Sequence, residues 1–118
     1  MNVIPIDQEK SEYIGRTDVP EKFVLEGKPS YETWLTRELP AEGKLRTGLW
    51  TGEPGTLTMR KYPTDEVCTV IYGKIEITNE DDSVLVLNPG DSVLVPKGWS
   101  GTWRNVEKSC KCFVSVGN

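Results

Sequence analysis

The segment 90–105, with the sequence GDSVLVPKGWSGTWRN, constrains the fold of this chain more than any other stretch. The two valines of its SVLV run share one face, which is the period of two that a strand shows when it packs on a core. The proline that follows ends this strand, Lys97 and Gly98 form a tight turn, and a return strand carries Trp103. The segment therefore predicts a hairpin of a small β-barrel.

Short strands separated by turn signals fill the rest of the chain from about residue 45. Eleven glycines and eight prolines are many for a helical protein but ordinary for strands joined by tight turns. The clearest turn signals are Gly52-Glu53-Pro54-Gly55 and Asn88-Pro89-Gly90. Strands are predicted at 45–50, 56–62, 66–72, 74–79, 83–87, 92–95, 101–106 and 110–116. Several short strands at such intervals indicate an all-β sandwich or barrel.

The N-terminal part of the chain is less regular. Residues 1–20 show no sustained period, so we expect an arm that lies on the barrel or on a partner, followed by one domain over residues 21–118. Residues 22–25 fit a short strand. The segment 31–39, YETWLTREL, fits both a helical face and a strand, and its threonines and tryptophan favour the strand. Residues 40–44 are predicted to form a turn.

The charge and the N-terminal sequence exclude several classes of partner. Eighteen acidic and fourteen basic residues give a net charge of −4, with no basic run that could neutralise nucleic-acid phosphates. No segment approaches the ~18 apolar residues of a membrane helix, and the N-terminus does not resemble a signal peptide. We therefore expect neither a nucleic-acid nor a membrane partner.

The three cysteines favour a reducing compartment. Cys110 and Cys112 lie two apart in a predicted strand, where their Cβ atoms would be roughly 6 to 7 Å apart, too far for a disulfide. We expect free thiols and a cytoplasmic protein.

Two spaced patterns resemble the motifs of the cupins. The segment 90–105 is similar to the second cupin motif, G-x5-P-x-G-x2-H-x3-N, except that Gly101 stands where that motif has a metal-binding histidine. The first motif, G-x5-H-x-H-x3/4-E-x6-G, is matched at its end by Glu66 and Gly73, whereas Arg60 and Tyr62 occupy the two histidine positions. The resemblance implies a jelly-roll β-barrel made of two antiparallel sheets.

A closer resemblance covers roughly residues 47–116. The phrases RKYPTDEVCTVIYG, LNPGDSVLVPKGWSGTW and CKCFVSVGN are similar to small single-domain cupins grouped with the (S)-ureidoglycine aminohydrolase cupin domain. That enzyme is metal-dependent and carries histidine ligands, but this chain has no histidine. One carboxylate, Glu66, cannot supply the defined ligand geometry that a divalent metal needs. We therefore expect no metal and no other cofactor, and a metal site rebuilt from Glu66, Tyr62 and Cys68 is the alternative.

Without a metal, an inward-facing Glu66 needs another cation, because a buried unpaired charge costs several kcal/mol. Arg60 precedes Glu66 by six residues, with a predicted turn between them. We expect adjacent strands to place the Arg60 guanidinium against the Glu66 carboxylate.

The remaining candidates would line the same pocket. Cys68 follows Glu66 on the same face and is either a nucleophile activated by Arg60 or a small packing residue. Tyr62 is either a general acid or a buried hydrogen-bonding phenol. Trp50 and Trp103 are either pocket walls or core residues.

Two functions follow from these residues. The first is a metal-free pocket for a small polar ligand, lined by Arg60, Tyr62, Glu66, Cys68, Trp50 and Trp103, with the question of catalysis left open. The second is a structural or regulatory cupin whose interior is filled and which acts through dimerisation. Exposed edge strands favour a homodimer in both cases.

Overall fold

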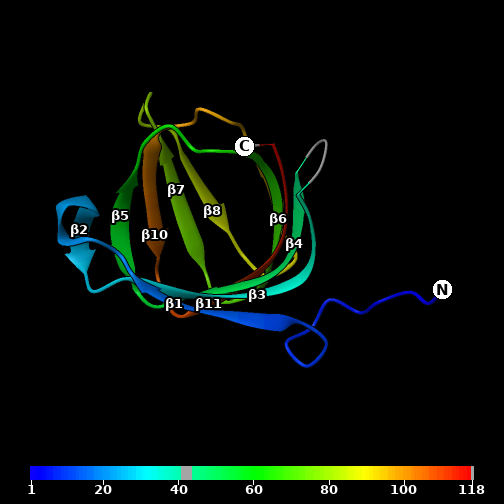
Figure 1. Ribbon diagram of the computed structural model, residues 1–118. Coiled ribbons are helices and arrows are strands. Elements are labelled where there is room, and N and C mark those ends of the chain that lie inside the picture. Colours follow the sequence, from blue (N-terminus) through cyan, green and yellow to red (C-terminus); the bar gives the residue numbers. More distant parts are fainter. Residues whose placement is uncertain (41–43, 118) are drawn as a thin grey trace.

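The computed structural model describes residues 1–40 and 44–117, which form a β-barrel of two antiparallel sheets facing each other (Figure 1). The all-β class and the jelly-roll-like arrangement predicted from the sequence are confirmed. The turn predicted at 40–44 lies largely outside the described residues. None of the described helical residues forms a segment long and apolar enough to cross a membrane.

The first sheet has six strands and forms one wall of the barrel. Their order is β1-β3-β4-β11-β6-β9, so the C-terminal strand lies at the centre of the sheet. The strands are β1 (Glu12–Asp18), β3 (Ser30–Leu39), β4 (Leu45–Gly52), β11 (Ser109–Val116), β6 (Asp65–Tyr72) and β9 (Ser92–Val95).

The second sheet has five strands and closes the other side. Their order is β2-β5-β10-β7-β8, which places the strand of Trp103 in the middle. The strands are β2 (Val24–Gly27), β5 (Gly55–Met59), β10 (Gly101–Asn105), β7 (Ile75–Asn79) and β8 (Val84–Leu87), with a short 3-10 helix η1 (Glu21–Phe23) before β2.

The predicted hairpin within residues 90–105 is wrong in its pairing, although both of its strands exist. β9 pairs with β6 in the first sheet, whereas β10 pairs with β5 and β7 in the second. The segment between them therefore crosses from one sheet to the other. Tyr62 fixes this crossing, because its amide donates to the Trp99 carbonyl and its carbonyl accepts from the Gly98 amide, both at 2.8 Å.

The N-terminal residues contribute a strand that the sequence did not predict. Residues 12–18, inside the expected arm, form β1 and pair with β3, so the part of the arm that precedes the sheets is the first eleven residues. These residues leave the barrel as an extended tail (Figure 1). The preference for a strand over a helix at 31–39 is confirmed by β3, and the strand expected at 22–25 is divided between η1 and β2.

The core lies between the two sheets and is completed by the inward residues of both. Trp103, Ile75 and Val70 are the largest fully buried apolar side chains. The other buried members of this core are Leu57, Cys68, Ile77, Leu87, Val95 and Phe113. This core fills one part of the barrel and leaves the part next to β1, β3 and β4 hollow.

Candidate functional site

The hollow part of the barrel is a cavity of about 640 Å³. Both sheets contribute to its wall, and most of the wall is apolar or hydroxyl-bearing. Among the residues that the structure describes, the formally charged side chains of the wall are those of Glu66, Lys111 and Arg46. The aromatic residues at the cavity are Phe23, Tyr31, Trp50, Tyr62 and Phe113, and the polar ones are Ser30, Thr17, Thr33, Thr58, Thr64, Asn105 and Ser115.

A buried ion pair between Lys111 and Glu66 forms the charged centre of this wall. The Lys111 Nζ lies 2.7 Å from the Glu66 Oε2, and the two side chains are 5% and 9% exposed. Lys111 comes from β11 and Glu66 from the neighbouring β6, where Lys111 is opposite Val70 and Glu66 is opposite Ser115. Because side chains alternate along a strand, both point into the barrel.

Two indole rings surround the ammonium group. The Lys111 Nζ lies 4.7 Å from the ring centroid of Trp50 and 4.6 Å from that of Trp103, within the range of cation–π attraction. The two rings meet edge to face, with centroids 6.1 Å apart. The ammonium is therefore held by one carboxylate and two aromatic faces.

A hydrogen-bonded pair of side chains fixes the inner indole. The Trp103 Nε1 donates to the Asn105 Oδ1 at 3.0 Å, and the Asn105 Nδ2 donates to the Glu53 carbonyl at 3.0 Å. Asn105 is 2% exposed, and its side chain also reaches the cavity wall. Asn105 thus holds the Trp103 ring in place beside Lys111.

The protonation states of Lys111 and Tyr62 follow from their burial and from the nearby Lys111–Glu66 ion pair. Burial alone would lower the pKa of the Lys111 ammonium, but the nearby Tyr62 and Glu66 oxygens outweigh it, so the pKa lies above the ordinary lysine value. Burial raises the pKa of the Tyr62 phenol to about 12, with Lys111 opposing the shift and Glu66 reinforcing it. At neutral pH, Lys111 is an ammonium and Tyr62 a neutral phenol.

The predicted ion pair between Arg60 and Glu66 is not formed. Arg60 is exposed and lines a separate shallow depression with Asn79, Glu80 and Ser100. β5 ends at Met59, and Lys61 has a φ of 51°, in the left-handed region, so the alternation of β5 does not continue through the loop. Lys111 supplies the cation that the sequence argument assigned to Arg60.

The other predicted residues divide between the cavity wall and the core. Tyr62, Glu66 and Trp50 line the cavity, as expected for a pocket. Cys68 and Trp103 are 2% and 0% exposed and belong to the core behind it. Burial raises the pKa of the Cys68 thiol, which is the opposite of what an activated nucleophile needs. All three cysteines are free thiols, as the sequence predicted.

The donor set does not fit a metal ion. The described residues contain no group of three or more His, Cys, Asp or Glu side chains placed to bind one, and Glu66 already faces an ammonium that would repel a cation. Gly101, at the histidine position of the second motif, has no room for a side chain. A Cβ there would overlap the Thr78 carbonyl oxygen and the Trp99 ring.

Lys111 and Arg46 are the site residues that the sequence argument missed. The sequence does indicate that Lys111 faces inward. In the strand CKCFVSV, the two-residue alternation places this lysine on the same face as Phe113. A charged residue on the core face of a central strand needs a buried partner, and Glu66 was the available acid. Arg46 faces inward by the same rule, since it is opposite Ser115 across β4 and β11.

Comparisons with known proteins agree with this architecture. The model of the EutQ-like cupin domain matches residues 39–113, which is more than half of the chain. The chain belongs to the EutQ-like cupin domain family. No match is found among curated proteins.

Solved cupins that resemble this one include proteins from several bacteria. A protein of unknown function from Pseudomonas syringae, of the DUF861 family, has 23% identity and a TM-score of 0.76, covering 89% of this chain and 43% of that protein. The EutQ protein of Clostridium difficile has 18% identity and a TM-score of 0.64, with coverages of 75% and 63%. A DUF861 protein from Thermotoga maritima has 33% identity and a TM-score of 0.53, with coverages of 57% and 75%. This cupin thus spans less than half the length of the Pseudomonas protein.

Proposed function

We propose that this cupin binds a small polar molecule in the barrel cavity without a metal ion. The observation that carries the proposal is the cavity of about 640 Å³, whose wall contains the buried Lys111–Glu66 pair. Ligand pockets usually have volumes of roughly 300 to 1,000 Å³ and combine apolar walls with a few polar groups. A cavity of this size also favours the pocket over the alternative of a filled, purely structural barrel.

The charges of the wall favour a ligand with one negative charge. Of the two cations in the described wall, Lys111 is neutralised by Glu66. The positive charge of Arg46 is not balanced by another charged residue of that wall. The Arg46 Nε lies 2.9 Å from the Glu38 Oε2 in a pair whose side chains are 44% and 50% exposed, so a carboxylate ligand can replace Glu38 at little cost. Planar guanidinium groups bind carboxylates with two parallel hydrogen bonds.

The aromatic walls favour a flat ligand. The rings of Tyr31 and Trp50 stack with centroids 6.0 Å apart, and both line the cavity. The resemblance to the (S)-ureidoglycine aminohydrolase group makes ureido acids, which are flat and anionic, the first compounds to test. Sugars and simple carboxylates form the comparison classes.

A hydrolytic reaction on such a ligand is the second candidate, and the cavity position of Tyr62 beside Glu66 favours it. With a pKa of about 12, the phenol would act as a hydrogen-bond donor or general acid. Glu66 is less suited to act as a base, because its Oε2 already accepts a hydrogen bond from Lys111. Release of ammonia from ureido acids would support the reaction, and stoichiometric binding without turnover would support binding alone.

The binding proposal is tested by ligand-dependent thermal shifts on the wild-type protein and two arginine variants. A ligand at a hundred times its Kd stabilises the folded state by about 2.7 kcal/mol, which corresponds to a shift of roughly 10 °C for a chain of 118 residues. Arg46→Met should weaken the binding of anionic ligands at least tenfold. Arg104→Met is the matched control, because Arg104 pairs with Glu76 on the second sheet and is not part of the cavity wall.

The proposal fails if none of the three ligand classes shifts the melting temperature of the wild-type protein. The ligand class is wrong if neutral sugars bind as well as anions, or if Arg104→Met weakens binding as much as Arg46→Met.

A further inference from the structure

A depression of about 240 Å³ lies on the second sheet, at the end where β5 and β7 stop and β10 begins. Three of the residues that line it are threonines, because Thr102 is directly opposite Thr58 on one side and Thr78 on the other. Trp103 points into the core, so by alternation Thr102 points to the outer face. Cross-strand neighbours on one face are ~5 Å apart. The floor of the depression is therefore a row of hydroxyl groups.

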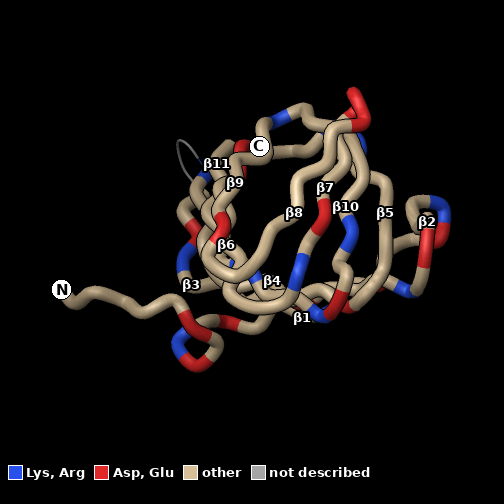
Figure 2. The backbone as a smooth tube through the Cα atoms, turned by 180° about the vertical axis from the view of Figure 1, so that it is seen from behind, with Lys and Arg blue, Asp and Glu red and all other residues tan. Residues whose placement is uncertain are grey.

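Charged residues of opposite sign lie on the two sides of this floor. Arg60 follows β5 on one side, and Glu80 and Asp82 belong to the turn between β7 and β8 on the other. Figure 2 shows this acidic turn at the end of β7 and β8. β10 separates β5 from β7, so the backbones of the two sides are ~10 Å apart, which is two strand spacings. The depression is positive on one side and negative on the other.

Hydrogen bonds hold both sides in place. The Lys61 amide donates to the Ser100 Oγ at 3.0 Å, which fixes the loop after β5. The Trp99 Nε1 donates to the Asn79 Oδ1 at 2.9 Å, which fixes the end of β7 before the acidic turn. Both sides are thus attached to the segment that crosses between the two sheets, and the fold sets the distance between them.

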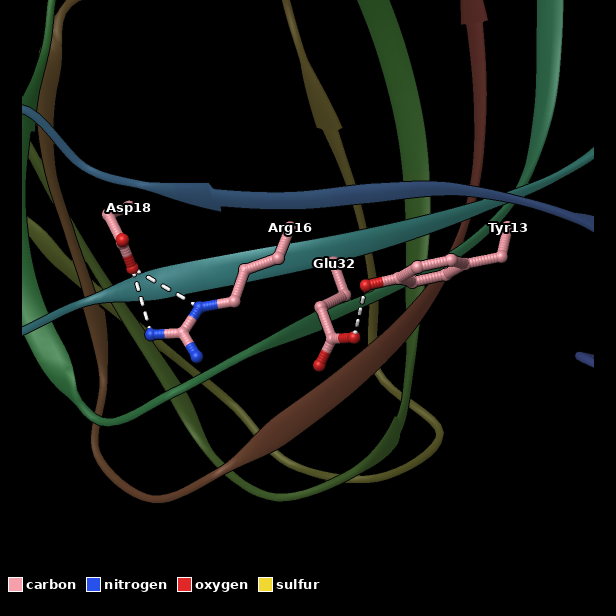
Figure 3. A network of polar contacts seen from close by, with 4 residues as sticks. All are labelled: Tyr13, Arg16, Asp18 and Glu32. Atoms are coloured by element: carbon pink, nitrogen blue, oxygen red, sulfur yellow. Dashed lines mark hydrogen bonds and ion pairs between the residues drawn. The ribbon is translucent and has the colours of Figure 1, made fainter.

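The charged groups of the depression are not paired with one another. Elsewhere on the surface, side chains of opposite charge contact each other, as Arg16 and Asp18 do at 2.9 Å (Figure 3). None of the ion pairs among the described residues involves Arg60, Glu80 or Asp82. One basic and two acidic side chains therefore face the depression with their charges available to a ligand.

We propose that this depression binds an amino acid that has a basic side chain. Such a molecule carries one carboxylate and two cationic groups, which match Arg60 on one side and Glu80 and Asp82 on the other. The threonine hydroxyls both donate and accept hydrogen bonds, so they can contact either kind of group. The volume of about 240 Å³ is below the roughly 300 to 1,000 Å³ of pockets for drug-sized molecules. It suits a ligand of amino-acid size.

The charges disfavour other small ligands. Glu80 and Asp82 would repel a phosphate or a dicarboxylate, and a diamine without a carboxylate would leave Arg60 uncompensated. A metal ion would lack ligands, because the described residues contain no group of three His, Cys, Asp or Glu side chains placed to bind one. A ligand with charges of both signs is the class that satisfies all three side chains.

The test is an NMR titration of the full chain with three related compounds at constant ionic strength. L-Lysine carries all three charged groups, 6-aminohexanoate lacks the α-ammonium, and 1,5-diaminopentane lacks the carboxylate. L-Lysine should shift the amide signals of Thr78, Gly101 and Thr102, which line the depression but not the barrel cavity. Each of the other two compounds should bind about tenfold more weakly, because each loses one hydrogen-bonded charged group.

Variants of the exposed charged residues assign the two sides. Arg60→Gln should weaken the binding of L-lysine about tenfold and leave that of 1,5-diaminopentane unchanged, because the diamine has no carboxylate. Glu80→Gln should weaken the binding of both compounds. Arg104→Gln is the matched control for Arg60→Gln, because Arg104 pairs with Glu76 on the same sheet and lies outside the depression. It should leave the binding of L-lysine unchanged.

The proposal is overturned if L-lysine at about 20 mM, twenty times a millimolar Kd, shifts none of the three amide signals. Shifts confined to Arg46 and Trp50 would place the ligand in the barrel cavity and would also overturn it. Equal affinities for L-lysine and 1,5-diaminopentane would show that Arg60 binds no carboxylate, which contradicts the proposed class. The same conclusion follows if Arg104→Gln weakens the binding of L-lysine as much as Arg60→Gln does.

Discussion

Replacement of Lys111 by methionine tests the buried pair directly. Methionine has a similar length and can remain between the two indole rings, so the substitution removes the charge with little change in volume. Glu66 would then be a carboxylate in a wall that exposes only 9% of its side chain. Removal of one partner of a buried ion pair costs about 3 to 5 kcal/mol, because the remaining charge has no compensation.

The same figure predicts a large change in thermal stability. At about 2.1 cal/mol/K per residue, 118 residues give an unfolding entropy of about 0.25 kcal/mol/K. A loss of 3 to 5 kcal/mol therefore lowers the melting temperature by roughly 12 to 20 °C. Scanning calorimetry at pH 7 measures this shift, and denaturant unfolding gives the free energy independently.

Two further variants separate the charge effect from packing. Lys111→Met combined with Glu66→Gln removes both charges and should recover more than half of the lost stability. Lys108→Met removes an exposed lysine that lies 3.5 Å from Glu53, and it should change stability by less than about 1 kcal/mol. The reasoning is refuted if Lys111→Met loses less than about 1 kcal/mol, or if the double variant is as unstable as the single one.

Two further predictions concern alkaline pH and the glycine in the second motif. Because the folded-state pKa of Tyr62 is raised to about 12 from its ordinary 10, its contribution to stability is complete below pH 10 and is lost between pH 10 and 12. This loss amounts to about 2 to 3 kcal/mol. Denaturant unfolding against pH should show it in the wild-type protein, and a Tyr62→Phe variant with the same slope would contradict it. Gly101→Ala should destabilise the fold by about 1 to 3 kcal/mol, because the added methyl group meets the Thr78 carbonyl and the Trp99 ring. A melting temperature equal to that of the wild-type protein would exclude that overlap.

The sequence predicted most of the strands because their alternation was clear and their turns carried glycine, proline or asparagine. It missed β1 because the sequence EYIGRTD lacks alternation, and six of its seven residues are exposed. An edge strand that buries so little of its surface leaves almost no hydrophobic pattern. The predicted pairing of β9 with β10 was wrong for a different reason. The local sequence does not specify whether the chain returns to the same sheet or crosses to the facing one.

The sequence indicated that Glu66 needs a cationic partner, but it did not identify which residue provides the cation. Glu66 faces inward and requires a cation, as the burial argument predicted. Arg60 would face inward if the in–out alternation of side chains along β5 continued past Met59. The strand ends there, and the left-handed backbone at Lys61 interrupts the alternation. Lys111 lies 45 residues from Glu66 along the chain and meets it only because β11 is inserted between β4 and β6. Such a contact depends on sheet order, which the sequence pattern alone does not give.

The presence of a buried ion pair is itself an argument about function. Ion pairs in protein interiors contribute little net stability, since desolvation of the two charges offsets most of their attraction. Two apolar residues between Trp50 and Trp103 would fill the same space at no such cost. The Lys111–Glu66 pair, however, is not enclosed by the core on all sides, because both residues also line a cavity of about 640 Å³. A pair of charges placed at the wall of a cavity can exchange part of its mutual attraction for contacts with a bound molecule, and a pair sealed in the core cannot.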